Sequence, residues 1–442
     1  MKFFKRTFQV IFLLPLLCSL TTEVKGQLLT LEEAVYEGLE NNFGIMIFRN
    51  QAGIAANNAT SGNAGFLPTL SAVASHTERV EDSNFETAID SRSTSGARSS
   101  NSNAAIQLSW TLFDGFQMFR ALDRLSLLKD VGDRELRLQM EFLVARITSE
   151  YNNIIRIEQQ IEILKNNIEV SEERISIEET KVDLGAASEY DLLQARSDLN
   201  ADRAAYIREN NRLITARIAF NELLSRSPSQ EFTIAGEIEV NRNLDRETLL
   251  SQLLLQNSEL TLARMEMTLR NIELDEISGE RYPEIILNSS YSFNRNENAG
   301  GFIRFSESTG FSAGITARFP IFDGFNQNRR VQNARINRRN AEISYEARKL
   351  QLEAEFERVF RTYLQSLELI TLEEENLSNA ELTLEIALER FRLGTITPLE
   401  FREAQRTLLQ AENRLISSKF DAKLAETDLL QLSGTLNELF PG

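Results

Sequence analysis

Apolar residues recur at seven-residue intervals through two long segments of the chain. The first series is Met140, Ile147, Ile154, Ile161, Ile168, Ile175 and Val182. The second series is Phe356, Tyr363, Ile370, Leu377, Leu384 and Phe391. A sustained spacing of seven predicts long helices that pack side by side as in a left-handed coiled coil. Residues 325–393 contain neither Gly nor Pro. At about 1.5 Å per residue, a helix of that length extends roughly 100 Å, which is taller than a compact globular domain.

Two other segments alternate between apolar and small or polar residues, which predicts β-strands with two unlike faces. The alternation is clearest in residues 102–113 and 310–320, and it is weaker in residues 69–80 and 284–295. Strands of about 9 to 11 residues suit a membrane barrel with lipid outside and water inside. A half-buried sheet in a soluble protein has the same period, so that interpretation stays open. The polar stretches 82–103 and 296–309 are predicted to be loops at the outer mouth of a barrel or disordered linkers.

The chain repeats itself once. FDGF occurs at residues 113–116 and again at 322–325, and LG occurs at Leu184–Gly185 and Leu393–Gly394. Both pairs of motifs are 209 residues apart. Each half therefore reads in the same order: helix, two strands, FDGF, long helix, LG and return helix. We predict one repeat over 27–240, with a hairpin at 69–113 and a tip near residue 185. The second repeat covers 241–442, with a hairpin at 284–322 and a tip near residue 394.

The two FDGF motifs are predicted to join a strand to a long helix. Asp114 and Asp323 are suited to cap the helix, while Gly115 and Gly324 allow the chain to turn. The aromatic residues at these junctions are typical of a lipid boundary. They are Phe113, Phe116, Phe322 and Phe325.

Composition narrows the range of functions. The net charge of −17 argues against a nucleic-acid partner, because no excess of Lys and Arg is present to neutralise phosphates. Cys18 and His76 are the only residues of their types, so we expect no metal, no cofactor and no enzymatic chemistry. Residues 1–26 have a basic start, an apolar run and a small residue before Gln27, which predicts an export signal. No later apolar run is long enough for a membrane-spanning helix, so any crossing must use strands.

Two hairpins supply four strands, and four strands cannot close a barrel in lipid without leaving unpaired edges. Three chains would supply twelve strands, so we expect a homotrimer. The long helices of the three chains would then continue as a helical tube.

The chain resembles the TolC-like outer-membrane efflux protein family. The resemblance lies in LTLEEAVYEGLENN (29–42), in the two FDGF motifs and in RFRLGTITPLEFREAQRTLLQAENRL (390–415), and it extends over essentially all of the chain after residue 26. It implies a fold of long antiparallel coiled-coil helices that form a trimeric tunnel, with four strands per chain in a shared 12-stranded barrel. It also implies a passive exit duct in the outer membrane with a periplasmic helical extension. The implied partners are a periplasmic adaptor protein, an inner-membrane pump of the ABC, RND or a similar class, and outer-membrane lipid.

The resemblance also assigns roles to residues at the LG turns. The turns would contact the adaptor through Leu184, Gly185, Leu393, Gly394 and Thr395, although plain helix turns would look the same. Past the turns, the positions of the periplasmic gate and its acidic ring are Asp191, Glu400, Glu403 and Phe391. A ring of carboxylates at a constriction favours cations, whereas a solvated acidic helix face has the same sequence. Family members place an arginine and a tyrosine where this chain has Ile396 and Phe391, so whether the gate is ionic or apolar stays open.

One alternative is a periplasmic coiled-coil scaffold or surface adhesin, which would share the export signal and the heptads. Two amphipathic hairpins at equivalent points of a duplication favour the channel. The sequence does not identify the cargo or the class of pump.

Overall fold

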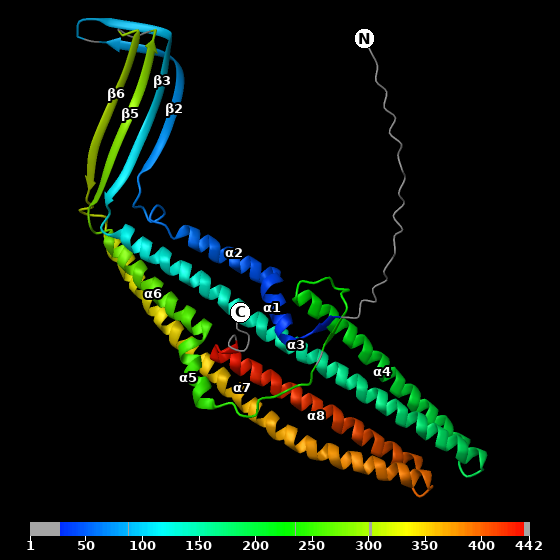
Figure 1. The fold of residues 1–442 in the computed structure, drawn as a ribbon. Helices are drawn as coiled ribbons and strands as arrows, with labels where there is room; N and C mark the ends of the chain where they lie inside the picture. Colours follow the sequence, from blue (N-terminus) through cyan, green and yellow to red (C-terminus); the bar gives the residue numbers. More distant parts are fainter. Residues whose placement is uncertain (1–26, 87, 235, 300–302, 437–442) are drawn as a thin grey trace, which may run out of the picture.

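The computed structural model describes residues 27–86, 88–234, 236–299 and 303–436. The predicted export signal lies outside these residues. Figure 1 shows a β-sheet at one end of the molecule and a bundle of long helices that extends away from it. The two helical turns that contain the LG motifs lie together at the far end of the bundle. The molecule is therefore elongated, with the sheet and the tips at opposite ends.

The elements occur in the same order in the two halves of the chain. The first repeat contains β1 (Gln27–Leu29), α1 (Leu31–Asn41), α2 (Phe43–Asn58), β2 (Thr69–Glu86), β3 (Ser91–Phe113), α3 (Gln117–Asp183) and α4 (Glu189–Leu223). The second contains β4 (Phe232–Ile234), α5 (Arg246–Gln256), α6 (Ser258–Gly279), β5 (Glu284–Asn298), β6 (Phe305–Arg318), α7 (Asn326–Arg392) and α8 (Pro398–Ser433). Helices α3 and α7 are each 67 residues long. They begin and end 209 residues apart, so the prediction of two matched long helices is confirmed.

The first helical segment consists of two helices, α1 and α2. It breaks at Asn42, where the backbone is extended. The side-chain oxygen of Asn42 accepts hydrogen bonds from the backbone N–H groups of Gly44 and Ile45. It thereby caps the start of α2, and the chain changes direction between the two helices. Asn257 does the same between α5 and α6 in the second repeat.

The four long strands form one antiparallel sheet in the order β2-β3-β5-β6. The two hairpins meet where β3 pairs with β5, and Ile106 lies opposite Tyr291 at the middle of this pairing. The predicted loops 82–103 and 296–309 were largely wrong, because β2 and β3 pair as far as Glu86 and Ser91, and β5 and β6 extend to Asn298 and Phe305. Backbone pairing along an existing hairpin needs no apolar side chains, so polar sequence did not end these strands.

The heptad series forms the core of the bundle along most of its length. Ile147, Ile154, Phe356 and Tyr363 are at most 1% exposed. One cluster packs α3 against α1, α4 and the small β1–β4 pair, and another packs α7 against α5 and α8. Burial of a large apolar side chain contributes about 1.5–3 kcal/mol. These repeated layers therefore stabilise the packing of the long helices against their neighbours.

Among the described residues, no helix is both long enough and apolar enough to span a membrane.

Candidate functional site

The two strand-to-helix junctions have the same geometry. Asp114 accepts a hydrogen bond from the backbone N–H of Met118 at 2.8 Å, and Asp323 accepts one from that of Gln327 at 2.6 Å. In each junction the glycine and the aromatic residue after it have positive φ angles. Their aromatic rings pack edge to face, Phe113 on Phe116 and Phe322 on Phe325. The predicted turn at FDGF is present, but the N-cap positions are Phe116 and Phe325, and each aspartate accepts its hydrogen bond from a position two residues before the cap.

The LG motifs turn the long helices back on themselves. Gly185 has a φ of 71° and Gly394 a φ of 70°. In each turn the glycine N–H and the next N–H donate to carbonyl groups of the preceding helix, at 2.8–3.1 Å. This is the hydrogen-bond pattern of a helix C-terminal turn, which favours glycine. The predicted turns are thus present, with the Leu184 and Leu393 side chains 78% and 76% exposed.

Two further apolar side chains at the tips were missed from the sequence. Tyr190 and Leu399 are 71% and 77% exposed, and they lie 209 residues apart like the LG motifs. With Leu184 and Leu393 they give each tip two exposed apolar side chains. Because Tyr190 and Leu399 occupy equivalent positions in the two repeats, the duplication could have identified them from the sequence.

The acids past the turns differ in their contacts. Glu400 accepts hydrogen bonds from the backbone N–H and the hydroxyl of Thr397 at 2.7 and 2.9 Å, in a capping box at the start of α8. The backbone hydrogen bond from Thr397, followed by the hydroxyl, lowers the pKa of Glu400. Glu403 is well exposed, and Arg406 lies 3.8 Å from it. Asp191 lies in the first turn of α4. Glu403 is therefore freer than Glu400 to interact with solutes.

Phe391 belongs to an apolar cluster inside the second tip. Its ring stacks on that of Phe401 with centroids 4.9 Å apart, and both side chains are fully buried. Ile396 packs against the same cluster. The two positions at which this chain departs from the family pattern are therefore apolar and lie within one hairpin.

The buried face of α3 changes character toward the tip. Asn167, Ser171, Arg174 and Glu178 are buried, with spacings of four, three and four residues. The heptad residues Ile168 and Ile175 are only half-buried in this region. The predicted apolar seam was therefore wrong beyond residue 167, where a polar seam replaces it. Burial raises the pKa of Glu178, and neither of its carboxylate oxygens has a hydrogen-bond partner among the described residues.

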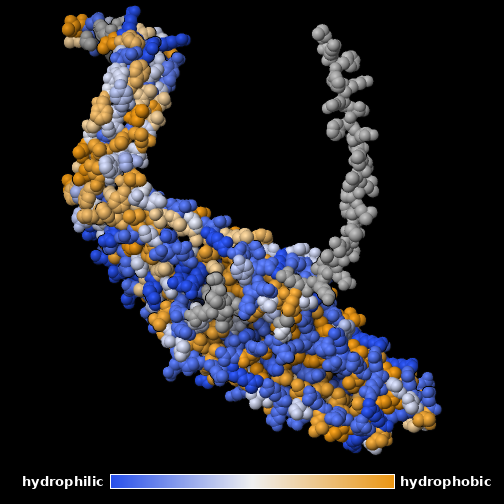
Figure 2. Space-filling view, in the orientation of Figure 1, coloured by the Kyte–Doolittle hydropathy of each residue, from blue (hydrophilic) through white to orange (hydrophobic). Residues whose placement is uncertain are grey.

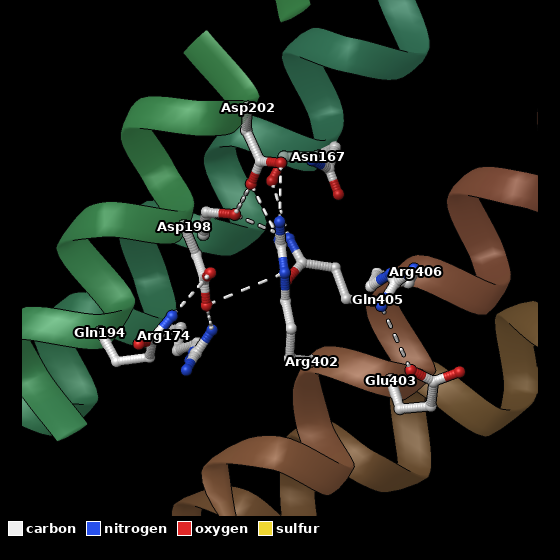
Figure 3. A network of polar contacts seen from close by, with 10 residues as sticks. Asn167, Arg174, Gln194, Asp198, Asp202, Arg402, Glu403, Gln405 and Arg406 are labelled. Carbon is white, nitrogen blue, oxygen red and sulfur yellow. Dashed lines mark hydrogen bonds and ion pairs between the residues drawn. The ribbon is translucent and has the colours of Figure 1, made fainter. Parts of the chain in front are cut away.

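Arg402 of α8 connects this polar seam to α4, as Figure 3 shows. Its guanidinium donates two hydrogen bonds to Asp202, both at 2.9 Å, and lies 3.9 Å from Asp198. Asp198 also accepts from Arg174 at 2.8 Å. All four side chains are largely buried, with at most 21% exposed. Planar two-point pairing of this kind is strong and geometrically specific. It joins the return helices of the two repeats.

Uncharged groups extend the same network. Gln405 donates to the Ser171 hydroxyl at 2.8 Å and to the Asn167 carbonyl at 3.0 Å. Ser171 in turn donates to Asp202 at 2.7 Å. The network therefore spans α3, α4 and α8.

Two more contacts join the hairpins close to the tips. The Lys181 ammonium donates to the Phe391 carbonyl at 2.7 Å and lies 3.7 Å from the centre of its ring. Arg392 is paired with Glu173.

We name Arg402 with Asp198 and Asp202 the inter-hairpin latch. The latch was not found from the sequence, because the partners of Arg402 come from the other repeat and carried no local signal.

The sheet has one apolar face next to the helices. On β3 it contains Leu108 and Ile106, and neighbouring strands add Leu287, Tyr291 and Phe311. Charged residues appear on this face farther from the helices, where Ser102 pairs with Arg295 and Arg295 pairs with Glu307. Figure 2 shows hydrophobic residues gathered over the part of the sheet next to the helices. This apolar band has the character of a lipid-facing surface.

Comparisons with known proteins agree with this architecture. The family model described as outer membrane efflux protein matches residues 35–226 and 249–435. The outer membrane protein TolC of Vibrio cholerae serotype O1 is 21% identical over 70% of this chain and 71% of its own length. Among solved structures, the outer-membrane channel OprN superposes with a TM-score of 0.77 at 18% identity, over 92% of this chain and 90% of that one. VceC of Vibrio cholerae gives a TM-score of 0.75 at 16% identity, over 91% and 96%.

These matches define the class of the protein, a passive outer-membrane channel for efflux or secretion whose helices form a periplasmic extension. The chain belongs to the outer membrane efflux protein family. The family match occurs twice, once in each half of the duplication.

Proposed function

We propose that three copies of this chain assemble into one continuous exit duct, with a 12-stranded barrel above a helical tunnel. The open sheet carries this proposal. Within the described residues, β2 and β6 are the outer strands of the sheet and each has one neighbour. Because unpaired backbone groups in lipid cost several kcal/mol each, an edge beside the apolar band must be covered. Pairing β2 of one copy with β6 of the next closes the ring.

The helices also carry apolar surface that a neighbouring copy would cover. On α7 an exposed stripe with heptad spacing contains Ile336, Ile343 and Leu350. On α4 the residues Leu193, Ile207 and Ile214 are exposed at multiples of the same spacing. Each stripe suits burial against a helix of a neighbouring copy at its own height in the bundle, in a heterologous contact that closes after three copies.

The tips are the proposed contact with a periplasmic adaptor. Exposed leucines at Leu184 and Leu393 give an apolar anchor at the end of each hairpin, with Gly185, Gly394 and Thr395 in the turns beside them. An adaptor docked there would connect the duct to an inner-membrane pump of the ABC, RND or a similar class, which would supply the energy. The duct itself would remain passive.

The acids near the tips are the proposed gate. Threefold symmetry would bring three copies each of Asp191, Glu400 and Glu403 around one axis, which favours cations at the constriction. The gate is ionic between hairpins, through the latch, and apolar within the second hairpin, through Phe391. This division accounts for the absence of the family arginine and tyrosine.

Electrophoresis and planar bilayers test the proposal. The purified full-length protein is expected to run as a trimer in sodium dodecyl sulfate without heating and to form small pores that favour cations. Monomers in mild detergent, together with no conductance, would contradict it. A scaffold would wash from the membrane with high salt, whereas the channel stays in the detergent-extracted fraction.

A further inference from the structure

The sheet face opposite the apolar band is polar and uncharged over a long stretch. The register aligns five successive layers of four residues, one from each strand. From the helices outward, these layers are Thr69, Ser109, Asn288, Gly314; Ser71, Gln107, Ser290, Ser312; Val73, Ala105, Ser292, Gly310; Ser75, Asn103, Asn294, Ser308; and Thr77, Asn101, Asn296, Ser306. Sixteen of these twenty positions carry a hydroxyl or an amide, and none carries a charge.

Charged side chains on this face occur at its two ends. Glu284 and Arg318 lie opposite each other next to the helices, so their charges offset. Arg79 lies one layer beyond Thr77, at the outer end. This surface therefore carries no charged side chain between those ends, although 26% of the residues of the whole chain are charged.

The same face is hollowed across all four strands. A groove of about 490 Å³ is lined mainly by residues of the two layers next to the helices, including Ser71, Gln107, Asn288 and Ser312, and the chain between these layers contributes Leu108, Ser289 and Ala313. Polar groups on this face also pair across strands. Asn103 donates to Asn294 at 2.5 Å, and the hydroxyls of Ser290 and Ser312 lie 2.9 Å apart. The face is thus a concave lattice of groups that both donate and accept hydrogen bonds.

We propose that this face passes cargo by hydrogen bonding and not by charge, and that it holds neutral, hydroxyl-rich solutes of the oligosaccharide class weakly as they pass. The inference rests on the proposed function, in which the polar face lines the lumen of the barrel. Charged rings in a lumen select by sign, whereas hydroxyls and amides exchange one hydrogen bond with water for another. Many weak sites in succession allow entry without trapping, which conduction requires.

Single-channel recording in planar bilayers tests this inference with two neutral polymers of matched hydrodynamic size. Maltohexaose carries donors and acceptors, while polyethylene glycol carries ether acceptors along its length. We expect maltohexaose added on the barrel side to block the current with dwell times at least about threefold longer than those of polyethylene glycol, since hydrogen bonds to several sites add. Asn103→Ala combined with Ser290→Ala should shorten the maltohexaose dwell time toward the polymer value.

Adjacent residues provide the matched control, because Ser289 and Ser290 point to opposite faces of β5. Ser289→Ala should leave the maltohexaose dwell time unchanged. In a Cys18→Ser background, Ser290→Cys should react with a charged, water-soluble thiol reagent in membranes, whereas Ser289→Cys should be protected.

These experiments distinguish failure of the hydrogen-bonding inference from failure of the proposed channel. Pores with equal dwell times for the two polymers would overturn the hydrogen-bonding inference and leave the channel intact. The same holds if the Asn103→Ala, Ser290→Ala double variant binds maltohexaose as the unmodified protein does. Absence of pores, or equal labelling of the Ser289→Cys and Ser290→Cys variants, would remove the barrel on which the inference rests.

Discussion

The two FDGF motifs have the same letters but different surroundings. A Cβ atom on Gly115 would lie 2.2 Å from the Gly279 carbonyl oxygen and 2.9 Å from the Tyr282 Cβ. A Cβ atom on Gly324 would lie 3.8 Å from its nearest neighbour, the Asn326 amide nitrogen. Both glycines have positive φ angles, at 74° and 69°. The first junction thus requires glycine for space and for conformation, and the second for conformation alone.

These glycines give a prediction that compares one change at two equivalent sites. Gly324→Ala should cost about 1–2 kcal/mol, the usual strain of a non-glycine residue in the left-handed region. Gly115→Ala should cost at least about 3 kcal/mol, because backbone must also move away from the new methyl group. The temperature at which the detergent-resistant trimer dissociates on gels measures both. Equal losses for the two variants would contradict the different packing of the junctions.

At the scale of elements, periodicity predicted the long helices almost to the residue. The positions of Gly and Pro and the heptad spacing are properties of the local sequence, and no contact with another part of the chain changes the helical structure that they predict for α3 and α7. The strands were underestimated because the polar ends of β2 and β3 are held by pairing with each other. Their length depends on a partner strand and not on their own alternation.

The polar seam near the tips is the element that sequence reasoning could not find. Asn167 and Ser171 have ordinary helical spacing, but which face of α3 is buried depends on where α8 packs. Arg402 meets Asp202 across 200 residues of sequence. A signal of that range needs the tertiary structure, whereas the turn at Gly394 was visible in the LG motif alone.

The latch predicts a change in channel opening. Arg402→Gln removes a buried pair that connects the two hairpins, so we expect larger single-channel conductance at neutral pH. Breaking a buried ion pair typically costs about 3–5 kcal/mol, enough to shift a closed state toward an open one. Arg414→Gln is the control, because Arg414 pairs with Glu373 within the second hairpin at 3.0 Å. Equal conductance changes in the two variants would show that the latch has no special part in closing.

At the scale of the whole molecule, the acids near the tips would form a ring only when three chains assemble. Glu403→Gln would remove one charge from each copy in the assembly, and we expect a smaller reversal potential in a salt gradient. Glu403 is the informative position, because Glu400 also caps α8 and its loss would disturb the helix start. Glu385→Gln, on α7 farther from the turn, is the charge-matched control. An unchanged reversal potential in Glu403→Gln would exclude this residue from the constriction.

The polar seam limits the thermal stability of the helical bundle near the tips. Buried apolar residues of matching size often stabilise helices better than a buried ionic network does. Replacing the whole network with well-packed aliphatic residues would therefore raise the melting temperature, and it would also fasten the two hairpins permanently; the network consists of Ser171, Arg174, Asp198, Asp202, Arg402 and Gln405. At these positions, the side chains that favour thermal stability would therefore differ from the side chains that favour transport. A polar seam therefore keeps the two hairpins separable at a cost in stability, whereas an apolar seam would not.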